Sequence, residues 1–227
     1  MNIFAKRCVF CEDYFKKQDC VWHSRFLCIC RDCWQTINNR TVHNIIEVQP
    51  PLSRIIPCLY YTDVVRKAVH NLKFNDNPAY TSAFSFIVEE RLNKIWELYQ
   101  FDAIVTLPLS KQRMNERGFN QSAFIADTAE KVLGIPQHNE YLTRVKDTNR
   151  QSSLNHYERI LNIRGAYSAS SAAKDKNILL VDDIYTSGST INEAAHTLRN
   201  AGAKTIMAIV FTSQPPRKRP DTRYIDI

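Results

Sequence analysis

The chain has 227 residues, of which 44% are apolar and 23% are charged, a composition typical of globular proteins. This length is enough for one sizeable core with a small appended unit. Its 30 basic and 23 acidic residues give a formal charge of +7, which favours anionic partners such as nucleotides, phosphates or nucleic acid. A charge of this size can equally serve only to keep a protein in solution. A membrane-spanning helix is excluded, because no apolar run approaches the length of about 20 residues that it needs.

The N-terminal segment MNIFAKRCVFCEDYF carries neither the apolar stretch nor the small-residue cleavage site of a signal peptide. We therefore expect a cytoplasmic protein without a membrane span. In that compartment thiols stay reduced, so closely spaced cysteines favour metal binding over disulfides.

Cysteines are concentrated at the start of the chain. All but one of the seven lie between positions 8 and 33: Cys8, Cys11, Cys20, Cys28, Cys30 and Cys33. Cys8 and Cys11 form one C-x2-C pair, and Cys30 and Cys33 form another. The spacer between the pairs, Glu12 to Ile29, has the length typical of a zinc ribbon, in which two tight turns aim four thiolates at one ion. We therefore expect Zn²⁺ on Cys8, Cys11, Cys30 and Cys33.

The predicted zinc has a structural role, because a shell of four thiolates leaves no open coordination position for catalysis. It holds together a small unit, residues 1–48, that has little core of its own. Other ligand sets remain open at this point. Cys28 competes with Cys30, and Cys20 or His23 lies nearby in the sequence.

Helical patterns follow the cysteine-rich unit. Residues 49–54, QPPLSR, read as a linker, and Cys58 in the apolar segment after it is expected to be a buried core thiol. Residues 62–74 have helical apolar spacing, and residues 83–99 form a second predicted helix. The polar face of the first helix is basic, with Arg66, Lys67, His70 and Lys73. That face is either a solvated surface or a nucleic-acid contact.

Apolar strands alternate with amphipathic helices in the rest of the chain. The predicted strands lie within residues 101–110, 177–185 and 204–212. The predicted helices cover residues 120–134, ended by Gly134 and Pro136, and residues 189–202. This alternation predicts an α/β domain over residues 55–227, with a parallel sheet flanked by helices.

Two polar loops follow predicted strands, LSKQRMNERG after the first and DDIYTSGST after the second. Ligands of such sheets bind beyond the carboxyl ends of the strands. Because both loops lie at that edge, we expect them to form one site.

The segment 178–190, ILLVDDIYTSGST, combines two chemical devices. Its second half opens a helix, where free N–H groups favour an anion, and Gly188 permits close backbone approach. Four hydroxyl groups add donors, those of Thr186, Ser187, Ser189 and Thr190. Asp182 and Asp183 repel a phosphate but suit hydroxyls or a bridging metal. A ribose 5-phosphate satisfies both halves, whereas a Walker A loop is excluded because no Gly-Lys-Ser/Thr follows.

Throughout its length this segment resembles the thirteen-residue signature of the type I phosphoribosyltransferases. The resemblance implies that Asp182 and Asp183 hold the ribose hydroxyls of phosphoribosyl pyrophosphate (PRPP). It implies that residues 186–190 hold the 5-phosphate. Mg²⁺ bridging the hydroxyls and the diphosphate is expected with PRPP.

In that fold the loop after the first core strand receives the diphosphate. The matching residues here are Leu109, Ser110, Lys111 and Arg113, with Arg117 close behind. Backbone amides and guanidinium groups there would stabilise the leaving diphosphate beside an oxocarbenium-like transition state. The resemblance therefore implies a catalytic group of Asp182, Asp183, Arg113 and Arg117.

The segment 144–164 has five basic and two acidic residues: Arg144, Lys146, Arg150, Arg159 and Arg164 against Asp147 and Glu158. It fits the place of a mobile lid over PRPP, and it equally fits a solvated charged loop.

Residues 107–122, residues 150–167 and the paired cysteines are together similar to the competence protein F family, over nearly the whole chain. Members of this family join an N-terminal zinc ribbon to a phosphoribosyltransferase-like domain and are associated with DNA uptake in natural transformation. The second ribbon of some relatives is not expected here. The resemblance implies a competence factor that binds PRPP, handles single-stranded DNA and works with a competence helicase.

A phosphoribosyltransferase that acts on an unidentified small-molecule acceptor is the alternative. Glutamine-dependent transfer is not expected, because Met1 is followed by Asn2 rather than by a catalytic cysteine. The basic tail at residues 215–220, the basic helix face and the ribbon suit contacts with single-stranded DNA. Inherited fold alone does not decide between the two functions.

Overall fold

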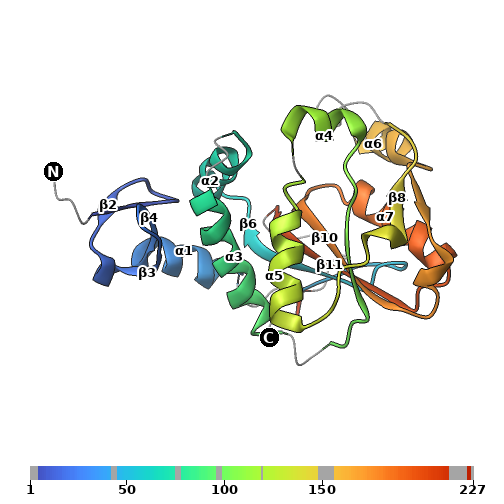
Figure 1. Cartoon of the computed structure of the whole chain (residues 1–227), viewed down its shortest axis with the longest axis horizontal. Coiled ribbons are helices and arrows are strands. Elements are labelled where there is room, and N and C mark those ends of the chain that lie inside the picture. Colours follow the sequence, from blue (N-terminus) through green and yellow to red (C-terminus); the bar gives the residue numbers. More distant parts are fainter. Residues whose placement is uncertain are drawn as a thin grey trace.

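The computed structural model of the chain describes residues 5–41, 45–74, 78–95, 99–118, 120–147, 156–214 and 224–225. Figure 1 shows a small N-terminal unit at one end of the molecule and a larger α/β unit beside it. We call residues 5–41 the ribbon.

The ribbon contains a four-stranded sheet and one helix. Its strands are β1 (Lys6–Cys8), β2 (Tyr14–Phe15), β3 (Cys20–His23) and β4 (Leu27–Cys30), in the order β2-β1-β4-β3. A 3-10 turn, η1 (Lys17–Asp19), precedes β3, and α1 (Arg31–Thr41) follows β4. The β1–β2 turn is closed by the Cys8 N–H, which donates to the Asp13 carbonyl at 2.8 Å, and Glu12 adopts a φ of +68° there.

The larger unit is built on a six-stranded sheet in the order β12-β5-β6-β11-β10-β7. Its strands are β5 (Ile45–Glu47), β6 (Arg54–Tyr60), β7 (Ala103–Thr106), β10 (Asn177–Tyr185), β11 (Thr205–Ser213) and β12 (Tyr224–Ile225). The pairs β6–β11, β11–β10 and β10–β7 are parallel, while β5 and β12 add antiparallel pairs at one edge. The predicted α/β fold class with a parallel sheet is confirmed.

Helices cover both faces of this sheet (Figure 1). They are α2 (Asp63–Phe74), α3 (Pro78–Leu92), α4 (Lys111–Arg117), α5 (Ala123–Leu133), α6 (His156–Ile163) and α7 (Ser189–Asn200). A hairpin of β8 (Leu142–Arg144) and β9 (Tyr167–Ala169) lies beside them, with the 3-10 turns η3 (Asn139–Tyr141) and η5 (Ser171–Ala173). α5 ends as predicted at Gly134, whose φ is +67° and whose N–H donates to the Glu130 carbonyl at 2.9 Å.

Two of the differences between the sequence prediction and the structure concern α3 and β6. The second helix is predicted over residues 83–99, but α3 runs from Pro78 to Leu92. Proline suits the first turn of a helix, where its missing N–H has no intrahelical partner. The apolar run around Cys58, for which no strand is predicted, forms β6, although a proline such as Pro57 is unusual in a central strand. Pro57 nevertheless stands opposite Val210 in the parallel β6–β11 pair.

Two buried clusters lie on opposite faces of the sheet. In β10, Leu179 and Val181 belong to one cluster, and Ile178 and Leu180 belong to the other. Buried on both faces, such strands read as continuous apolar runs, which explains why β10 and β11 are recognisable from sequence.

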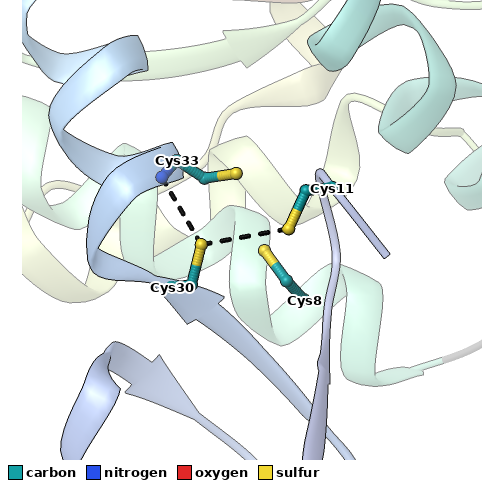
Figure 2. Close-up of side chains that lie close together, drawn as sticks. All are labelled: Cys8, Cys11, Cys30 and Cys33. Atoms are coloured by element: carbon teal, nitrogen blue, oxygen red, sulfur yellow. Dashed lines mark hydrogen bonds between the residues drawn. The ribbon is translucent and has the colours of Figure 1, made fainter. Parts of the chain in front are cut away.

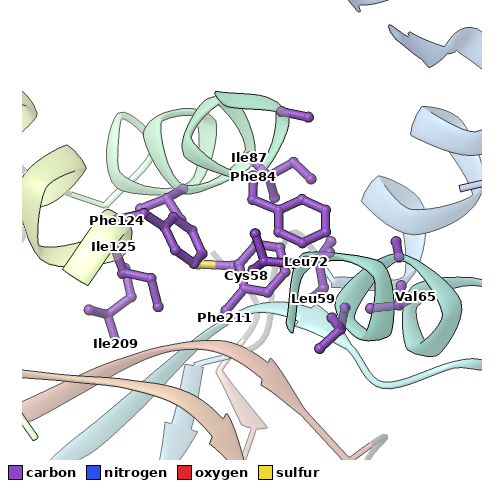
Figure 3. Close-up of a cluster of buried hydrophobic side chains, with 14 of the residues drawn as sticks. Cys58, Leu59, Val65, Leu72, Phe84, Ile87, Phe124, Ile125, Ile209 and Phe211 are labelled. Carbon is purple, nitrogen blue, oxygen red and sulfur yellow. The ribbon is translucent and has the colours of Figure 1, made fainter. Parts of the chain in front are cut away.

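Phe84 of α3 lies at the centre of the first cluster (Figure 3). Its ring centroid lies 4.5 Å from that of Phe211 on β11 and 6.3 Å from that of Phe124 on α5. Cys58 of β6 lies in the same cluster with 4% of its surface exposed, and burial raises the pKa of its thiol to about 12. The expectation of a buried core thiol is confirmed.

The ribbon shares this core. The ring centroids of Phe10 and Phe84 are 6.3 Å apart in a stacked arrangement, and those of Trp34 on α1 and Phe86 on α3 are 5.4 Å apart. Leu52, within the predicted linker, is 1% exposed. Strand β5, which lies inside the predicted ribbon range of 1–48, pairs with β6 in the large sheet. The segment after the ribbon therefore packs as part of the fold and does not act as a free spacer.

Within the described ranges, no helix combines the length and the apolar character needed to cross a membrane.

Candidate functional site

The two polar loops predicted to form one site are neighbours in the structure. β7 and β10 are parallel, with Thr106 opposite Val181, and the Leu107 N–H donates to the Val181 carbonyl at 2.9 Å. The chain leaves β7 through residues 107–110 into α4, and it leaves β10 through residues 186–188 into α7. Both loops therefore begin at the carboxyl edge of the sheet, where ligands of parallel α/β folds bind.

Asp182 and Asp183 lie near the end of β10, just before that edge. Both are half-buried. The Asp183 N–H donates to the Asp182 carboxylate at 2.8 Å, which fixes the orientation of that carboxylate. Ionised carboxylates only accept hydrogen bonds, so this pair suits hydroxyl donors or a cation.

The hydroxylated loop is held in shape by its own atoms. The Ser187 and Ser189 hydroxyl oxygens are 2.8 Å apart, and the Asn192 N–H donates to the Gly188 carbonyl at 2.9 Å as α7 begins. Gly188 has a φ of +77°, and a Cβ there would lie 2.9 Å from the ring of Tyr185. The position therefore requires glycine for both its backbone and its space.

Tyr185 is not among the predicted site residues. Its ring packs against Gly188, and its carbonyl accepts the Gln214 N–H at 3.3 Å, which ties the end of β10 to the end of β11. The sequence shows an aromatic residue at position 185 within the signature segment. Residue spacing alone does not predict that the ring of this residue packs against the loop.

The loop after β7 is supported by side chains from other segments. Ser110 is 4% exposed, while Leu109 is half-buried and Lys111 is exposed. The Asn120 side-chain amide donates to the Leu107 carbonyl at 3.0 Å, and the Arg144 guanidinium donates to the Pro108 carbonyl at 3.5 Å. These contacts hold the carbonyls of Leu107 and Pro108 in place.

A backbone amide of the loop has an acidic partner. The Lys111 N–H donates to the Asp147 carboxylate at 3.2 Å. Asp147 and Arg144 belong to the segment predicted as a lid, so the start of that segment lies on the candidate diphosphate loop. Arg144 also places its guanidinium 5.5 Å from the Tyr167 ring centroid of β9.

Several predicted residues lie wholly or partly outside the described part of the chain. Arg113 and Arg117 belong to α4, but their side chains are not among the described ones. The same holds for the side chains of Lys73 and Arg159. Residues 148–155, with Arg150, and the tail 215–220 lie outside the described residues altogether. The rest of the predicted basic face, Arg66, Lys67 and His70, is exposed on α2.

The ribbon brings four cysteines together (Figure 2). The sulfur atoms of Cys8, Cys11, Cys30 and Cys33 all lie within 4.8 Å of one another. Cys8 ends β1, Cys11 follows in the turn, Cys30 ends β4 and Cys33 lies in the first turn of α1. The Cys33 N–H donates to the Cys30 sulfur at 3.4 Å, and the Cys11 and Cys30 sulfurs are 4.0 Å apart.

This donor set fits a tetrahedral metal ion. Four sulfurs at a zinc–sulfur distance of about 2.3 Å form a tetrahedron with edges of about 3.8 Å. Without a cation the thiols resist joint ionisation. Hydrogen bonds from Cys28 and then Cys33 lower the pKa of Cys8, and its thiolate in turn raises the pKa of Cys33. A bound cation removes this conflict by deprotonating all of its thiol ligands.

Cys28, the alternative to Cys30, lies outside the group of four. Its sulfur lies 3.5 Å from the Lys6 carbonyl oxygen and also interacts with Cys8, while the Cys20 thiol donates to the Lys16 carbonyl at 3.2 Å. Cys28 and Cys30 flank Ile29 on β4, and only Cys30 stands at the end of that strand, beside the start of α1. This position explains why Cys30 joins the group of four sulfurs and Cys28 does not.

The parallel sheet, with a signature-bearing loop at its carboxyl edge, defines the larger unit as a type I phosphoribosyltransferase-like fold. A family profile described as Phosphoribosyl transferase domain matches residues 116–227. Among solved structures, the allosteric regulatory enzyme of purine biosynthesis is similar with 20% identity and a TM-score of 0.41. That likeness covers 58% of this chain and 26% of the enzyme's chain.

Curated relatives match larger parts of the chain. DNA utilization protein YhgH of Salmonella typhimurium is 30% identical over 164 residues, which are 71% of this chain and 72% of that protein. Competence protein F of Haemophilus influenzae is 24% identical over 220 residues, which are 91% of this chain and 96% of that protein. The chain belongs to the competence protein F family.

Proposed function

We propose that the protein is a competence-type factor that binds PRPP at the carboxyl edge of its sheet and handles single-stranded DNA in the cytoplasm. The observation that carries the PRPP part is the adjacency of the two polar loops, joined by the bond from the Leu107 N–H to the Val181 carbonyl. The names of the relatives, Competence protein F and DNA utilization protein YhgH, support the DNA part. A competence helicase is the proposed protein partner.

In this proposal each loop binds a different part of PRPP. Asp182 and Asp183 accept hydrogen bonds from the ribose hydroxyls. Residues 186–190 bind the 5-phosphate through amides and hydroxyls near the start of α7. The backbone of Leu109, Ser110 and Lys111 binds the diphosphate, and Arg113 and Arg117 supply positive charge. Mg²⁺ bound with PRPP offsets the charge between diphosphate and carboxylates.

The ribbon cysteines hold Zn²⁺ as a structural ion in this proposal. Cys8, Cys11, Cys30 and Cys33 supply four thiolates, and the closed shell excludes a substrate position. The ion cross-links β1, β4 and α1 and so adds to the apolar packing that the ribbon shares with the sheet.

Phosphoribosyl transfer to a small-molecule acceptor is the second candidate function. The family profile over residues 116–227 favours it. In this case Asp182, Asp183, Arg113 and Arg117 are the catalytic group, and diphosphate is released. The two candidates share the PRPP site and differ in whether turnover occurs.

Calorimetric titration of the zinc-loaded protein with PRPP and Mg²⁺ tests the site. We expect saturable binding, and at least tenfold weaker binding for Asp182→Asn combined with Asp183→Asn. Asp102→Asn combined with Asp175→Asn is the matched control, because it removes the same charge away from the loops. Unchanged affinity in a folded, zinc-loaded double mutant at 182 and 183 would overturn the assignment.

A second titration separates the candidate functions. Single-stranded DNA is titrated with and without PRPP. A change in DNA affinity on adding PRPP links the two ligands thermodynamically and supports the DNA-handling role. Steady release of diphosphate with a defined acceptor, and no DNA binding, supports the transferase.

A further inference from the structure

The ribbon exposes aromatic side chains that the rest of the protein buries. Among the described residues, eight large apolar side chains are exposed, and the two aromatic ones both lie in the ribbon. They are Tyr14, 65% exposed, and Phe26, 68% exposed. An exposed ring in a protein whose other described rings pack in or against the core indicates a binding surface.

Phe26 is presented on a rigid turn between β3 and β4. The Lys6 ammonium donates to the carbonyls of Ser24 at 2.6 Å and Arg25 at 3.1 Å, and thereby fixes the turn from the neighbouring strand. The Ser24 N–H donates to the Leu27 carbonyl at 2.8 Å and closes the turn. The Arg25 guanidinium lies 5.0 Å from the Phe26 ring centroid. The turn therefore presents a flat ring beside a cation.

Tyr14 lies one strand away from this turn. It stands opposite Arg7 in the β1–β2 pair, and the Arg7 N–H donates to the Phe26 carbonyl at 2.9 Å. Neighbouring strands are about 4.8 Å apart, so the backbones of Tyr14 and Phe26 are separated by about 10 Å. Tyr14 and Phe26 therefore belong to one small sheet and its adjoining turn, in the unit at the end of the molecule (Figure 1).

The charge around the rings favours an anionic partner. Residues 5–31 contain six basic and three acidic residues: Lys6, Arg7, Lys16, Lys17, Arg25 and Arg31 against Glu12, Asp13 and Asp19. Four thiolates on a divalent zinc ion would reduce this excess of positive charge to about +1, so the cations nearest the rings matter more than the net charge. Within the described ribbon the one ion pair is Arg7–Glu12, at 2.9 Å. The charges of Lys6 and Arg25, the cations of the turn, are not neutralised by a carboxylate in that part of the chain.

We propose that Tyr14 and Phe26, with Arg25 and Lys6, form a base-stacking platform for single-stranded DNA. Exposed rings accept unpaired bases because every base has a π face, and neighbouring cations bind the phosphates. A duplex hides its base faces, so it cannot use the rings. This inference rests on the proposed DNA-handling role and assigns it a surface on the ribbon, away from the PRPP loops.

Fluorescence anisotropy with a labelled thymidine oligonucleotide and the full-length zinc-loaded protein tests the platform. We expect Phe26→Leu and Tyr14→Leu each to weaken binding by about fivefold or more, because each removes one stacking partner. Phe26→Tyr retains a ring and is expected to retain the wild-type affinity. Since Leu keeps an apolar side chain, the Leu and Tyr variants at position 26 separate stacking from general hydrophobicity.

An abasic oligonucleotide of the same length separates stacking from charge. We expect the wild type to bind it as weakly as the double Leu variant binds the normal oligonucleotide. Phosphate contacts by Lys6 and Arg25 alone predict a slope of log affinity against log salt of about −1.4. Equal affinity of the wild type for abasic, duplex and normal DNA would overturn the platform.

Measuring the zinc content and the PRPP affinity of every variant distinguishes a failure of the stacking platform from a failure of the PRPP site. If all variants bind PRPP and zinc as the wild type does, but ring removal leaves DNA affinity unchanged, the platform is wrong and the PRPP site stands. If ring removal weakens DNA binding while PRPP does not bind the wild type, the platform stands and the PRPP assignment falls. Self-association that is lost in Phe26→Leu, without any DNA binding, assigns the rings to contacts between copies and overturns the proposal.

Discussion

Single residues decide whether the candidate phosphate loop can form. Gly188 combines a positive φ with the ring of Tyr185 at 2.9 Å from the position of a Cβ. Gly134 has a similar φ of +67° with no atom within 4 Å of that position. Alanine substitution at Gly134 therefore tests backbone strain alone, whereas alanine substitution at Gly188 tests strain and crowding together.

Gly188→Ala is expected to lower the free energy of unfolding by more than Gly134→Ala does. Backbone strain costs both variants about 1 kcal/mol, and crowding against Tyr185 adds to it only at position 188. Only Gly188→Ala should also weaken PRPP binding. Denaturant unfolding and calorimetry measure the two effects, and equal losses of stability in both variants would contradict the role of the Tyr185 ring.

Asp147 competes for an amide that the proposal assigns to the diphosphate. Its carboxylate accepts the Lys111 N–H at 3.2 Å, so an incoming diphosphate must displace it. We expect Asp147→Asn to strengthen binding of Mg²⁺-diphosphate several-fold, because a neutral amide is a weaker acceptor and does not repel an anion. Asp19→Asn in the ribbon makes the same charge change and should have no effect. Weaker binding in Asp147→Asn would show that the carboxylate assists the ligand.

At the scale of elements, the ribbon depends on where β1 and β4 end and where α1 begins. Cys30 and Cys28 are two residues apart on β4, yet only Cys30 belongs to the group of four sulfurs. We expect Cys30→Ser to abolish stoichiometric zinc binding and Cys28→Ser to retain it. Elemental analysis of the purified variants measures this. Loss of zinc in Cys28→Ser alone would reverse the ligand assignment.

At the scale of the whole molecule, the ribbon and the sheet share one core through Phe84. Its side chain is fully buried, and its ring lies 4.5 Å from Phe211 and 6.3 Å from Phe10 of the ribbon. We expect Phe84→Ala to lower the free energy of unfolding by about 3–5 kcal/mol. Because the core is continuous, ribbon and sheet should unfold in one transition, and chelation of zinc should lower its midpoint. Calorimetry that resolves two independent transitions would contradict this.

The sequence by itself determined the features that depend on local pattern. The extent of β10, the end of α5 at Gly134 and the neighbouring loops at one sheet edge all followed from runs of apolar residues and the glycines beside them. Cysteine spacing likewise predicted the four sulfurs that meet in the ribbon. These features form within a few residues or follow from the fixed direction of parallel strands.

Only the tertiary structure decided which distant segments touch. Strand β6 was not predicted, and only its pairing with β11, in which Pro57 stands opposite Val210, shows that this apolar run is a strand of the sheet. The packing of Phe10 on Phe84 joined the ribbon to the core, and the contact of Asp147 with Lys111 joined the predicted lid segment to the diphosphate loop. Such contacts depend on packing between segments far apart in the chain, and no local spacing encodes them.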